Sequence, residues 1–324
     1  MTTRPAVHFH IPGSVIGNPA KLALFYGPIM EGLDSLGAAL GLFLLDRSDM
    51  AELVEKAPGF HIIDHGSFRH PRVLNCGQAY LPPYRNLDPW GIRALSSIAA
   101  QSFDPDQIVP DAARAFADGL RRRWVGGRLS RHRQPAVHEN LPGPAVAVFL
   151  QSEGHRILGD TAYVAMRPML AAVLARDDSR PILIKPHPFD RNVDTQAYLR
   201  DLAAADPRVR LTGANLHDIL AKSAAVVTIN SAVGIEAMLY NLPLVLCGQS
   251  DFHHGAVTAR HPGDIGPAIA SAEAAFWSHD AFLYWYFHQN CLSGEDPNLA
   301  GTVVQRIAAT GFDLASLGLA QPKN

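Results

Sequence analysis

The 324-residue chain is poor in cysteine, and its three cysteines, Cys76, Cys247 and Cys291, stand far apart. They share no Cys-x-x-Cys spacing, which argues against a disulfide framework and against the common zinc sites. The chain also lacks an excess of one charge, because 28 Lys and Arg against 30 Asp and Glu give a net charge of -2. That balance disfavours binding of nucleic acid through counterion release. We therefore expect neither a metal site nor a nucleic-acid partner.

Long apolar runs are missing as well. No stretch approaches the ~20 apolar residues that a membrane-spanning helix needs, and the first residues lack the apolar core of a signal peptide. Together with cysteines that suit reduced thiols, this predicts a cytoplasmic protein. With 48% hydrophobic and 18% charged residues, the chain has a globular composition and is long enough for two domains.

Short aliphatic runs alternate with helical patterns along most of the chain, which predicts parallel sheets with helical crossovers. Residues 129–144 are rich in proline and charge and are predicted to form a linker, and residues 80–91 a proline-rich aromatic loop. The predicted strands are 7–11, 41–45, 59–63, 145–150, 182–184, 209–211, 225–229 and 242–246. The main predicted helices are 21–36, 111–124, 161–175, 194–205, 215–221, 234–240 and 299–308.

These elements predict three segments. Residues 1–140 are expected to form an N-terminal Rossmann-like domain, residues 141–290 a second Rossmann-like domain that binds the nucleotide, and residues 291–324 a C-terminal helical segment. The basic run 121–123 ends a predicted helix and suits its C-terminal charge, although an anionic acceptor or a membrane surface remains an alternative.

Polar residues follow three predicted strands of the second domain. Residues 151–153 read Gln-Ser-Glu, residues 185–188 read Lys-Pro-His-Pro, and residues 230–237 read Asn-Ser-Ala-Val-Gly-Ile-Glu-Ala. Ligands bind at the carboxyl ends of parallel strands, where such residues collect. The combination predicts an anion site for a phosphorylated nucleotide sugar.

Each of these residues has a chemical role and a plainer alternative. Prolines on both sides, Pro188 among them, would orient His187 toward a phosphoryl oxygen, with Lys185 beside it; a histidine bonded to a carbonyl is the alternative. The hydroxyl of Ser231 and the amides after Asn230 would bind the anion, or Ser231 would only cap a helix.

Three further residues complete the predicted donor site. Gly234 would let a ligand or a strand approach closely, and Glu236 would accept ribose hydroxyls unless it is only a favourable helix-start charge. A carboxylate at Glu153 near bound anions would suit a general acid or base, or would lie on a solvated loop. In the first domain, Asp64 and His65 end a strand and are candidates on the acceptor side, or His65 only caps a turn.

The three motifs, with Pro243 and Gly248 after them, resemble the capsule polysaccharide biosynthesis family, whose best understood members are bacterial retaining β-Kdo glycosyltransferases that use CMP-Kdo. The similarity runs from about residue 146 to residue 258. It implies a GT-B-like α/β fold, in which two Rossmann-like domains face a central cleft and a C-terminal helix packs back.

Carried onto this sequence, the resemblance implies that His187 and Ser231 contact the nucleotide phosphate or the sugar carboxylate, and that Glu236 holds the cytidine ribose. It also implies that Gln151 and Glu153 line the catalytic centre. The chain departs from the family where further acidic residues tend to follow the Gln-x-Glu, because Gly154 and His155 stand there. Either Glu153 is then the nucleophile, with Asp160 and Asp64 in reserve, or the chemistry differs.

The leading hypothesis is a cytoplasmic, metal-independent glycosyltransferase that moves a Kdo-like sugar from a CMP-activated donor to a capsule, O-antigen or glycolipid acceptor. It requires no cofactor beyond the CMP-sugar substrate, and it leaves open a peripheral association with the membrane. A sialyltransferase and a CDP-glycerol-type phosphotransferase are rivals that share a His-Pro element. A non-catalytic partner that binds sugar nucleotides in polysaccharide assembly is the alternative from another class.

Overall fold

The computed structural model describes residues 5–152 and 161–321, and packing divides the chain into two compact units. The first unit comprises residues 1–101 and 287–324, and the second comprises residues 102–286. Residues 102–140 thus pack with the second sheet, so the division by packing lies elsewhere than the expected boundary at residue 140.

The first unit contains a six-stranded sheet in the order β12-β5-β4-β3-β1-β2. Neighbours among β1 to β4 pair in parallel, whereas β5 pairs antiparallel with β4 and β12 antiparallel with β5. The order reverses between β1 and β3, which makes their carboxyl ends a topological switch point. The strands are β1 (Ala6–Ile11), β2 (Leu40–Leu44), β3 (Gly59–Asp64), β4 (Val73–Gln78), β5 (Tyr84–Asp88) and β12 (Leu292–Ser293).

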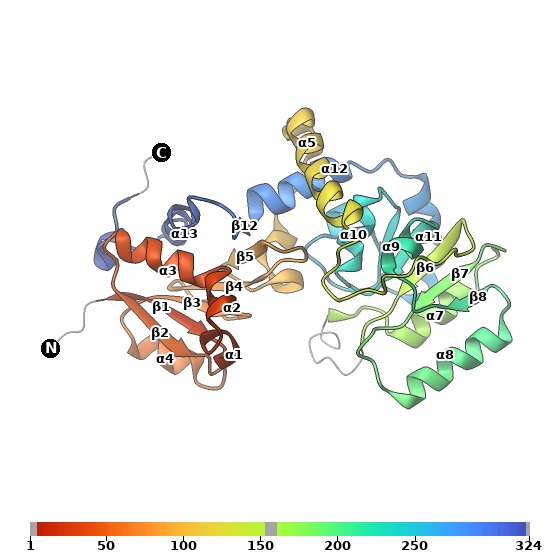
Figure 1. Ribbon diagram of the computed structural model, residues 1–324, viewed down its shortest axis with the longest axis horizontal. Coiled ribbons are helices and arrows are strands. Elements are labelled where there is room, and N and C mark those ends of the chain that lie inside the picture. The colour runs from red at the N-terminus through yellow and green to blue at the C-terminus, as the bar shows by residue number, and fades with distance from the viewer. Residues whose placement is uncertain (1–4, 153–160, 322–324) are drawn as a thin grey trace. The chain divides into compact units, whose positions relative to one another are not determined.

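Helices cover both faces of this sheet. In Figure 1, α3 and α13 lie on one side and α4 on the other. Side chains from α3, α13 and the sheet share one buried core, including Leu33, Phe60 and Val303, so the predicted return of the C-terminal helix is confirmed. The helices are α1 (Gly13–Ile16), α2 (Pro19–Ala23), α3 (Tyr26–Ser35), α4 (Met50–Lys56) and α13 (Leu299–Ala308).

Two sequence predictions in this unit were wrong. The helix expected over residues 21–36 is two helices, α2 and α3, because Phe25 between them leaves the helical conformation and buries its ring. The loop expected over residues 80–91 contains strand β5, which pairs with β4 from Asn75 opposite Asp88 to Gln78 opposite Arg85. The prolines 82 and 83 form only the turn before that strand.

The second unit contains a six-stranded, fully parallel sheet in the order β11-β10-β9-β6-β7-β8. From β6 the chain proceeds outward through β7 and β8, then returns to β9 and proceeds the other way. This is the Rossmann order, and its switch point lies between β6 and β9. The strands are β6 (Ala145–Phe149), β7 (Ile182–Lys185), β8 (Val209–Leu211), β9 (Ser223–Thr228), β10 (Leu244–Leu246) and β11 (Val257–Thr258).

Helices also flank this sheet (Figure 1). Buried side chains of α7, α8 and α11 pack against one face, including Met169, Leu199 and Ile269, while α9 and α10 contact β9 from the other face. The helices are α5 (Pro110–Arg121), α7 (Met166–Leu174), α8 (Val193–Ala205), α9 (Leu216–Leu220), α10 (Val233–Leu239), α11 (Ile265–Ala274) and α12 (His279–Leu283).

Arg121, at the end of α5, explains why residues 102–140 join this unit. Its Nε donates to the backbone oxygen of Leu239 at 2.9 Å, and its guanidinium also pairs with Asp118 and Asp280. These bonds tie α5 to α10 and α12. The first arginine of the basic run 121–123 is therefore committed to packing within the unit.

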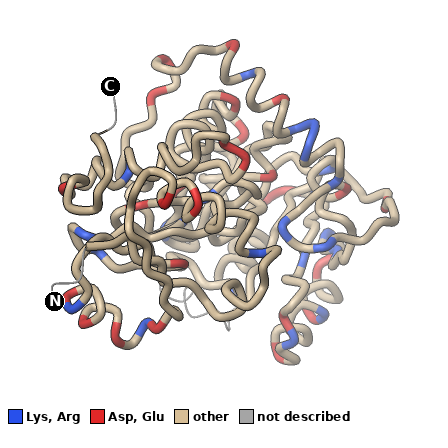
Figure 2. The backbone as a smooth tube through the Cα atoms, turned by 60° about the vertical axis from the view of Figure 1, so that its left-hand side comes forward, with Lys and Arg blue, Asp and Glu red and all other residues tan. Residues whose placement is uncertain are grey.

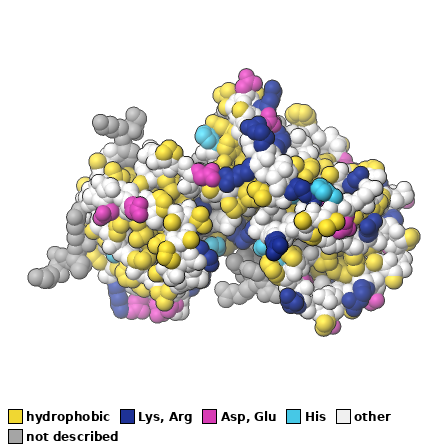
Figure 3. Space-filling view, in the orientation of Figure 1, with side chains coloured by type: hydrophobic (Ala, Val, Ile, Leu, Met, Phe, Trp, Pro, Cys, Tyr) yellow, Lys and Arg dark blue, Asp and Glu magenta, His cyan; other side chains and the backbone are white. Residues whose placement is uncertain are grey.

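Charges of both signs are interspersed along the tube of the chain (Figure 2). On the face shown in Figure 3, apolar and uncharged surface separates them within each unit. Among residues 5–152 and 161–321, no helix combines the length and the apolarity needed to cross a membrane.

Candidate functional site

The switch point of the second unit is bridged by two of the predicted site residues. Gln151 lies two residues beyond the end of β6, and Asn230 two residues beyond the end of β9. The backbone N–H of Asn230 donates to Gln151 Oε1 at 3.0 Å, and Gln151 Nε2 donates to Asn230 Oδ1 at 2.9 Å. The structure thus brings together two residues that stand 79 positions apart in the sequence.

Asn230 makes two further bonds that fix its orientation. Its Nδ2 donates to Thr161 Oγ1 at 2.9 Å and to the backbone oxygen of Gln249 at 3.0 Å. Asn230 therefore joins the ends of β6, β9 and β10, and its side-chain amide is largely occupied by the protein. Gln151 Nε2 carries a second N–H, which suits a ligand at the switch point.

Lys185 ends β7, the strand next to β6. Its ammonium group donates to the backbone oxygens of Ala214 at 2.6 Å and Gly213 at 3.3 Å. Burial lowers the pKa of Lys185, although the nearby charge of Glu139 acts in the opposite direction. Lys185 therefore holds the turn between β8 and α9, and an ammonium group with two of its three donors used has one left for an anion.

His187 follows β7 and lies in a turn of the chain. Its Nδ1 accepts from the backbone N–H of Phe189 at 3.3 Å, while the exposed Pro188 stands between them. In a neutral ring this contact places the proton on Nε2, so that Nε2 is the donor. The ring also meets His132 and Phe189, with centroid distances of 5.7 Å in each case.

Ser231, Gly234 and Glu236 lie at the start of α10. Ser231 Oγ accepts only a long bond, 3.4 Å, from the backbone N–H of Val233. Gly234 is buried, and a Cβ there would come within 2.6 Å of the Phe252 ring. The Phe252 ring leaves no room for a Cβ at this position. The close approach expected at Gly234 is therefore made by another side chain of the protein.

Glu236 is almost fully buried, with 2% of its surface exposed, and among the described residues its Oε1 has no hydrogen-bond partner. Burial raises the pKa of Glu236 to about 7, against the opposing effects of a hydrogen bond from Ser130 and the charge of Arg131. A buried carboxyl with an unsatisfied oxygen is costly. Among the described residues, the Glu236 carboxyl therefore has an incomplete set of hydrogen-bond partners.

Residues 128–139, here called the strap, cover this end of the unit. The sequence predicted a linker here, whereas the structure shows a segment bound to α9. Arg128 donates to both oxygens of Asp218 at 2.8 and 3.1 Å, and the backbone N–H of Glu139 donates to Asp218 Oδ2 at 3.1 Å. These bonds, with Arg128 the main cause, lower the pKa of Asp218 to about 2. The predicted irregular backbone is present, but its role as a linker was wrong.

The switch point of the first unit carries Asp64 and His65. Asp64 is buried at the end of β3, and its Oδ2 accepts from His65 Nδ1 at 2.6 Å. The hydroxyl of Tyr26 donates to Asp64 Oδ1. Burial alone would raise the pKa of Asp64, but the bonds from His65 and Tyr26 and the charge of Arg85 outweigh it and lower that pKa.

His65 is the exposed member of this pair, with 42% of its side chain accessible. Its backbone has φ +48°, a left-handed conformation that a non-glycine residue adopts at some cost. Because Nδ1 faces Asp64, the opposite nitrogen, Nε2, is the one available to an external group. The arrangement is an imidazole held by a buried carboxylate.

Two predicted residues, Glu153 and the reserve candidate Asp160, lie outside the described residues. Within the part of the chain that is described, no group of three or more His, Cys, Asp and Glu residues is placed to hold a metal ion.

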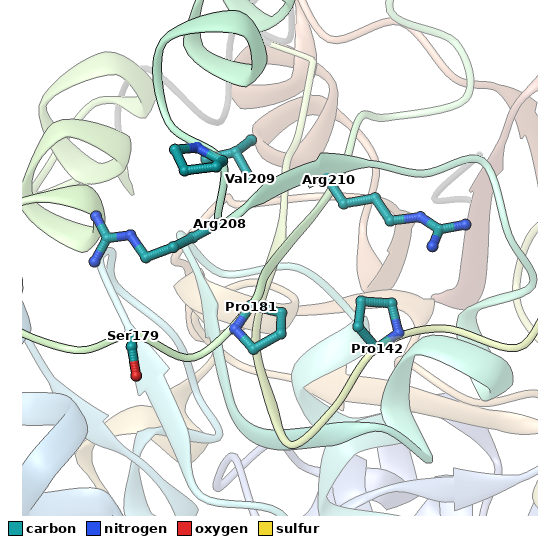
Figure 4. Close-up of a pocket in the computed structure, with 7 residues that line it drawn as sticks. Pro142, Ser179, Pro181, Arg208, Val209 and Arg210 are labelled. Atoms are coloured by element: carbon teal, nitrogen blue, oxygen red, sulfur yellow. The ribbon is translucent and has the colours of Figure 1, made fainter.

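A surface pocket of about 500 Å³ opens at the other end of the second sheet (Figure 4). Pro142, Pro181 and Arg208 line it, and they precede β6, β7 and β8. Arg208 is already bonded to Asp206 and to three backbone oxygens. This pocket is therefore separate from the strand ends that carry the predicted site.

The family match found by comparison with known proteins lies within the second unit. The sequence profile described as "Capsule polysaccharide biosynthesis protein" matches residues 143–283, the stretch from just before β6 to α12. No curated protein sequence matches the chain.

Two solved structures from Thermosulfurimonas dismutans share the fold. The KpsC beta Kdo 2,7 transferase is 14% identical with a TM-score of 0.54, covering 86% of this chain and 88% of that one. The KpsC beta Kdo 2,4 transferase is 13% identical with a TM-score of 0.50, covering 86% and 89%. The expected GT-B-like α/β fold, with two mainly parallel sheets, is confirmed, and residues 143–283 match the model of the capsule polysaccharide biosynthesis protein family.

Proposed function

We propose that this protein is a glycosyltransferase that moves an acidic, Kdo-like sugar from a CMP-activated donor to a capsule, O-antigen or glycolipid acceptor. The observation that carries the proposal is the convergence of Gln151, His187 and the 230–231 segment on the carboxyl ends of β6, β7 and β9, beside the switch point of a Rossmann-ordered sheet. All of these residues lie in the stretch that matches the family. The Kdo transferases with the same fold support the choice of sugar.

In the proposed site the donor phosphate lies beside His187 Nε2–H and the remaining N–H of Lys185, and Ser231 with the amides of the 231–234 turn completes its environment. Such preorganised donors stabilise the charge that develops on a departing phosphate. No metal ion is then required for the departure of CMP. Glu236 would bind ribose hydroxyls through its unpartnered oxygen.

Retention of the anomeric configuration would take two displacements. First a carboxylate oxygen bonds to the anomeric carbon, while CMP departs with the electron pair of the broken bond. The acceptor hydroxyl then replaces the carboxylate and gives up its proton. Glu153 remains our proposed nucleophile from the sequence. In the first unit, Asp64 and His65 remain our proposed residues of the acceptor side, with the imidazole held by the buried carboxylate.

We propose that the reaction takes place in the cytoplasm, at the inner face of the membrane, where the enzyme would encounter a glycolipid or a growing polysaccharide. Arg121 is committed to packing, whereas its neighbour Arg122 is exposed and would meet anionic lipid. Loss of vesicle binding in Arg122→Ser is the expected result.

The test is the release of CMP from CMP-Kdo in the presence of a polysaccharide or glycolipid acceptor. His187→Ala should lower turnover by at least ~100-fold, the usual scale for loss of one preorganised electrostatic group. His288→Ala, which removes an exposed histidine of the first unit, is the control. Turnover near that of the wild type in His187→Ala would contradict the site.

Other donors separate the rival functions. Turnover with CMP-sialic acid alone would identify a sialyltransferase, and formation of a phosphodiester from CDP-glycerol would identify a phosphotransferase. Tight binding of CMP without turnover of any donor would indicate a non-catalytic partner in polysaccharide assembly.

A further inference from the structure

His132 brings a second imidazole to the end of β7. Its ring centroid lies 5.7 Å from that of His187, with an interplanar angle of 82°, and 5.2 Å from that of Phe189, at 87°. Phe189 is 64% exposed, so this group of three rings borders solvent. The two imidazoles meet edge to face, although 55 positions separate them in the sequence.

The strap fixes the backbone on both sides of His132. Two residues earlier, Ser130 is hydrogen-bonded to Glu236. Two residues later, Gln134 Oε1 accepts from the backbone N–H of Leu216 at 3.2 Å, and its Nε2 donates to the backbone oxygen of His132 at 3.1 Å. An imidazole held in this way reaches its ligand with little loss of conformational entropy.

Among the described residues, the ring nitrogens of His132 have no hydrogen-bond partner, because its contacts are with the rings of His187 and Phe189 and through its backbone oxygen. His187 uses Nδ1 to accept from the backbone N–H of Phe189. His132 therefore brings its open ring nitrogens beside His187, so that two half-buried imidazoles lie at one strand end. A role in packing alone does not explain why both ring nitrogens of His132 lack hydrogen-bond partners among the described residues.

The charges around the pair favour an anion. Burial and the adjacent guanidinium of Arg131 lower the pKa of His132, and a bound phosphate would reverse that effect by stabilising the imidazolium form. Lys185, at the same strand end, is a further cation. The charged and titratable groups on the elements that carry or contact the two rings are Arg128, Arg131, Arg133, His138 and Glu139 on the strap, Lys185 on β7, Asp190 and Arg191 after Phe189, and Glu236 on α10.

We propose that His132 is a second ligand of the donor phosphate and that it acts together with His187 as a two-imidazole phosphate clamp. This proposal rests on the proposed function and adds to it a residue outside the family stretch, because His132 precedes residue 143. The clamp binds the phosphate monoester of CMP after transfer and the phosphodiester of the donor before it. The ligand class it recognises is a nucleoside monophosphate.

The test is isothermal titration of the full-length protein with CMP, with cytidine and with inorganic phosphate, at pH 6 and pH 8. His132→Ala should weaken CMP binding by about tenfold or more at pH 6, as expected for loss of a hydrogen bond to a charged group, and should leave cytidine binding unchanged. Proton uptake on binding CMP, measured in buffers of different ionisation enthalpy, should also fall. His138→Ala is the matched control, because His138 lies on the strap and contacts Asp218 but not His187.

Equal affinity for CMP in wild type and His132→Ala, with equal proton uptake, would overturn the clamp while leaving the proposed function intact. An equal loss in His138→Ala, or a parallel loss for cytidine, would also overturn it, because the strap as a whole would then be responsible. If the wild type binds inorganic phosphate through His132 but does not bind CMP, the clamp stands and the proposed donor is wrong. If it binds neither, both are wrong.

Discussion

Gln151 and Asn230 exchange two hydrogen bonds across the point where the second sheet reverses its strand order, at 3.0 Å from the Asn230 backbone N–H and at 2.9 Å from Gln151 Nε2. The crevice at a switch point exists because neighbouring crossovers leave the sheet in opposite directions. The hydrogen bonds between Gln151 and Asn230 fix the separation between the ends of β6 and β9. Gln151 is thus a positioning residue as well as a proposed site residue.

The first prediction concerns this pair. Asn230→Ala should destabilise the protein by about 1–3 kcal/mol, because it removes the acceptor of Gln151 Nε2 and the bonds that Asn230 Nδ2 donates to Thr161 and to the backbone oxygen of Gln249. Adding Gln151→Ala should cost much less than its effect in the wild type, since the two residues share one network. Urea unfolding of the two single variants and the double variant measures this coupling. Additive losses would show that the pair does not act as a unit.

The second prediction concerns the pH dependence of stability set by Glu236. Its pKa is about 4.5 when unfolded and about 7 when folded. Above pH 4.5 the unfolded chain loses this proton first, so stability falls as pH rises toward 7, by roughly 3 kcal/mol on the scale of ~1.4 kcal/mol per pKa unit. Glu236→Gln should therefore stabilise the protein more at pH 8 than at pH 5. Equal changes in melting temperature at pH 5 and pH 8 would contradict a Glu236 carboxyl whose pKa is raised by burial.

The third prediction concerns buried histidines in the first unit. His10 Nε2 and His61 Nδ1 lie 2.9 Å apart, and both rings are fully buried. Burial, followed by the charges of neighbouring histidines, lowers the pKa of His10 to about 4 and that of His61 to about 3. Below pH 6.5 the unfolded chain takes up these protons while the folded chain does not, so stability is lost as pH falls from 6.5.

Hydrogen exchange followed by mass spectrometry should detect this effect as faster exchange in β1 and β3 between pH 6.5 and 5, after correction for intrinsic rates. His10→Gln keeps a donor toward His61 and removes one titrating group, so the variant should show a weaker acid effect. An acid response confined to the second unit would contradict the prediction.

The fourth prediction concerns the pair Asp64 and His65. Asp64→Asn removes the carboxylate that orients His65, so turnover should fall by about 100-fold, in the range of general base catalysis, with little change in KM for the donor. Glu55→Gln is the control, because Glu55 pairs with His70 at 3.2 Å on the surface of the same unit. A fall in both variants would indicate a loss of stability instead.

The sequence motifs placed the predicted site residues at the correct strand ends, because each motif directly follows a buried aliphatic run. Alternation of strands and helices likewise predicted two parallel sheets. The strand order did not follow from the sequence, since pairing of β6 with β9 depends on contacts between residues about 80 positions apart.

The strap was missed for a similar reason. Its prolines and charges have the composition of a linker, and only the folded chain shows that Asp218 collects Arg128, His138 and the backbone of Glu139. His132 therefore carried no sequence signal. Glycine 234 illustrates the converse, because a sequence shows that a glycine is present but not that the Phe252 ring requires it.

The measurement that tests the central claim most directly is thermal stabilisation by CMP, CDP, UDP and GDP, since a ligand that binds only the folded state raises Tm. The account predicts selective stabilisation by CMP, which Glu236→Ala abolishes and His187→Ala reduces. Stabilisation by UDP or GDP in place of CMP, or no response to any of the four, would contradict a CMP-sugar donor at this site.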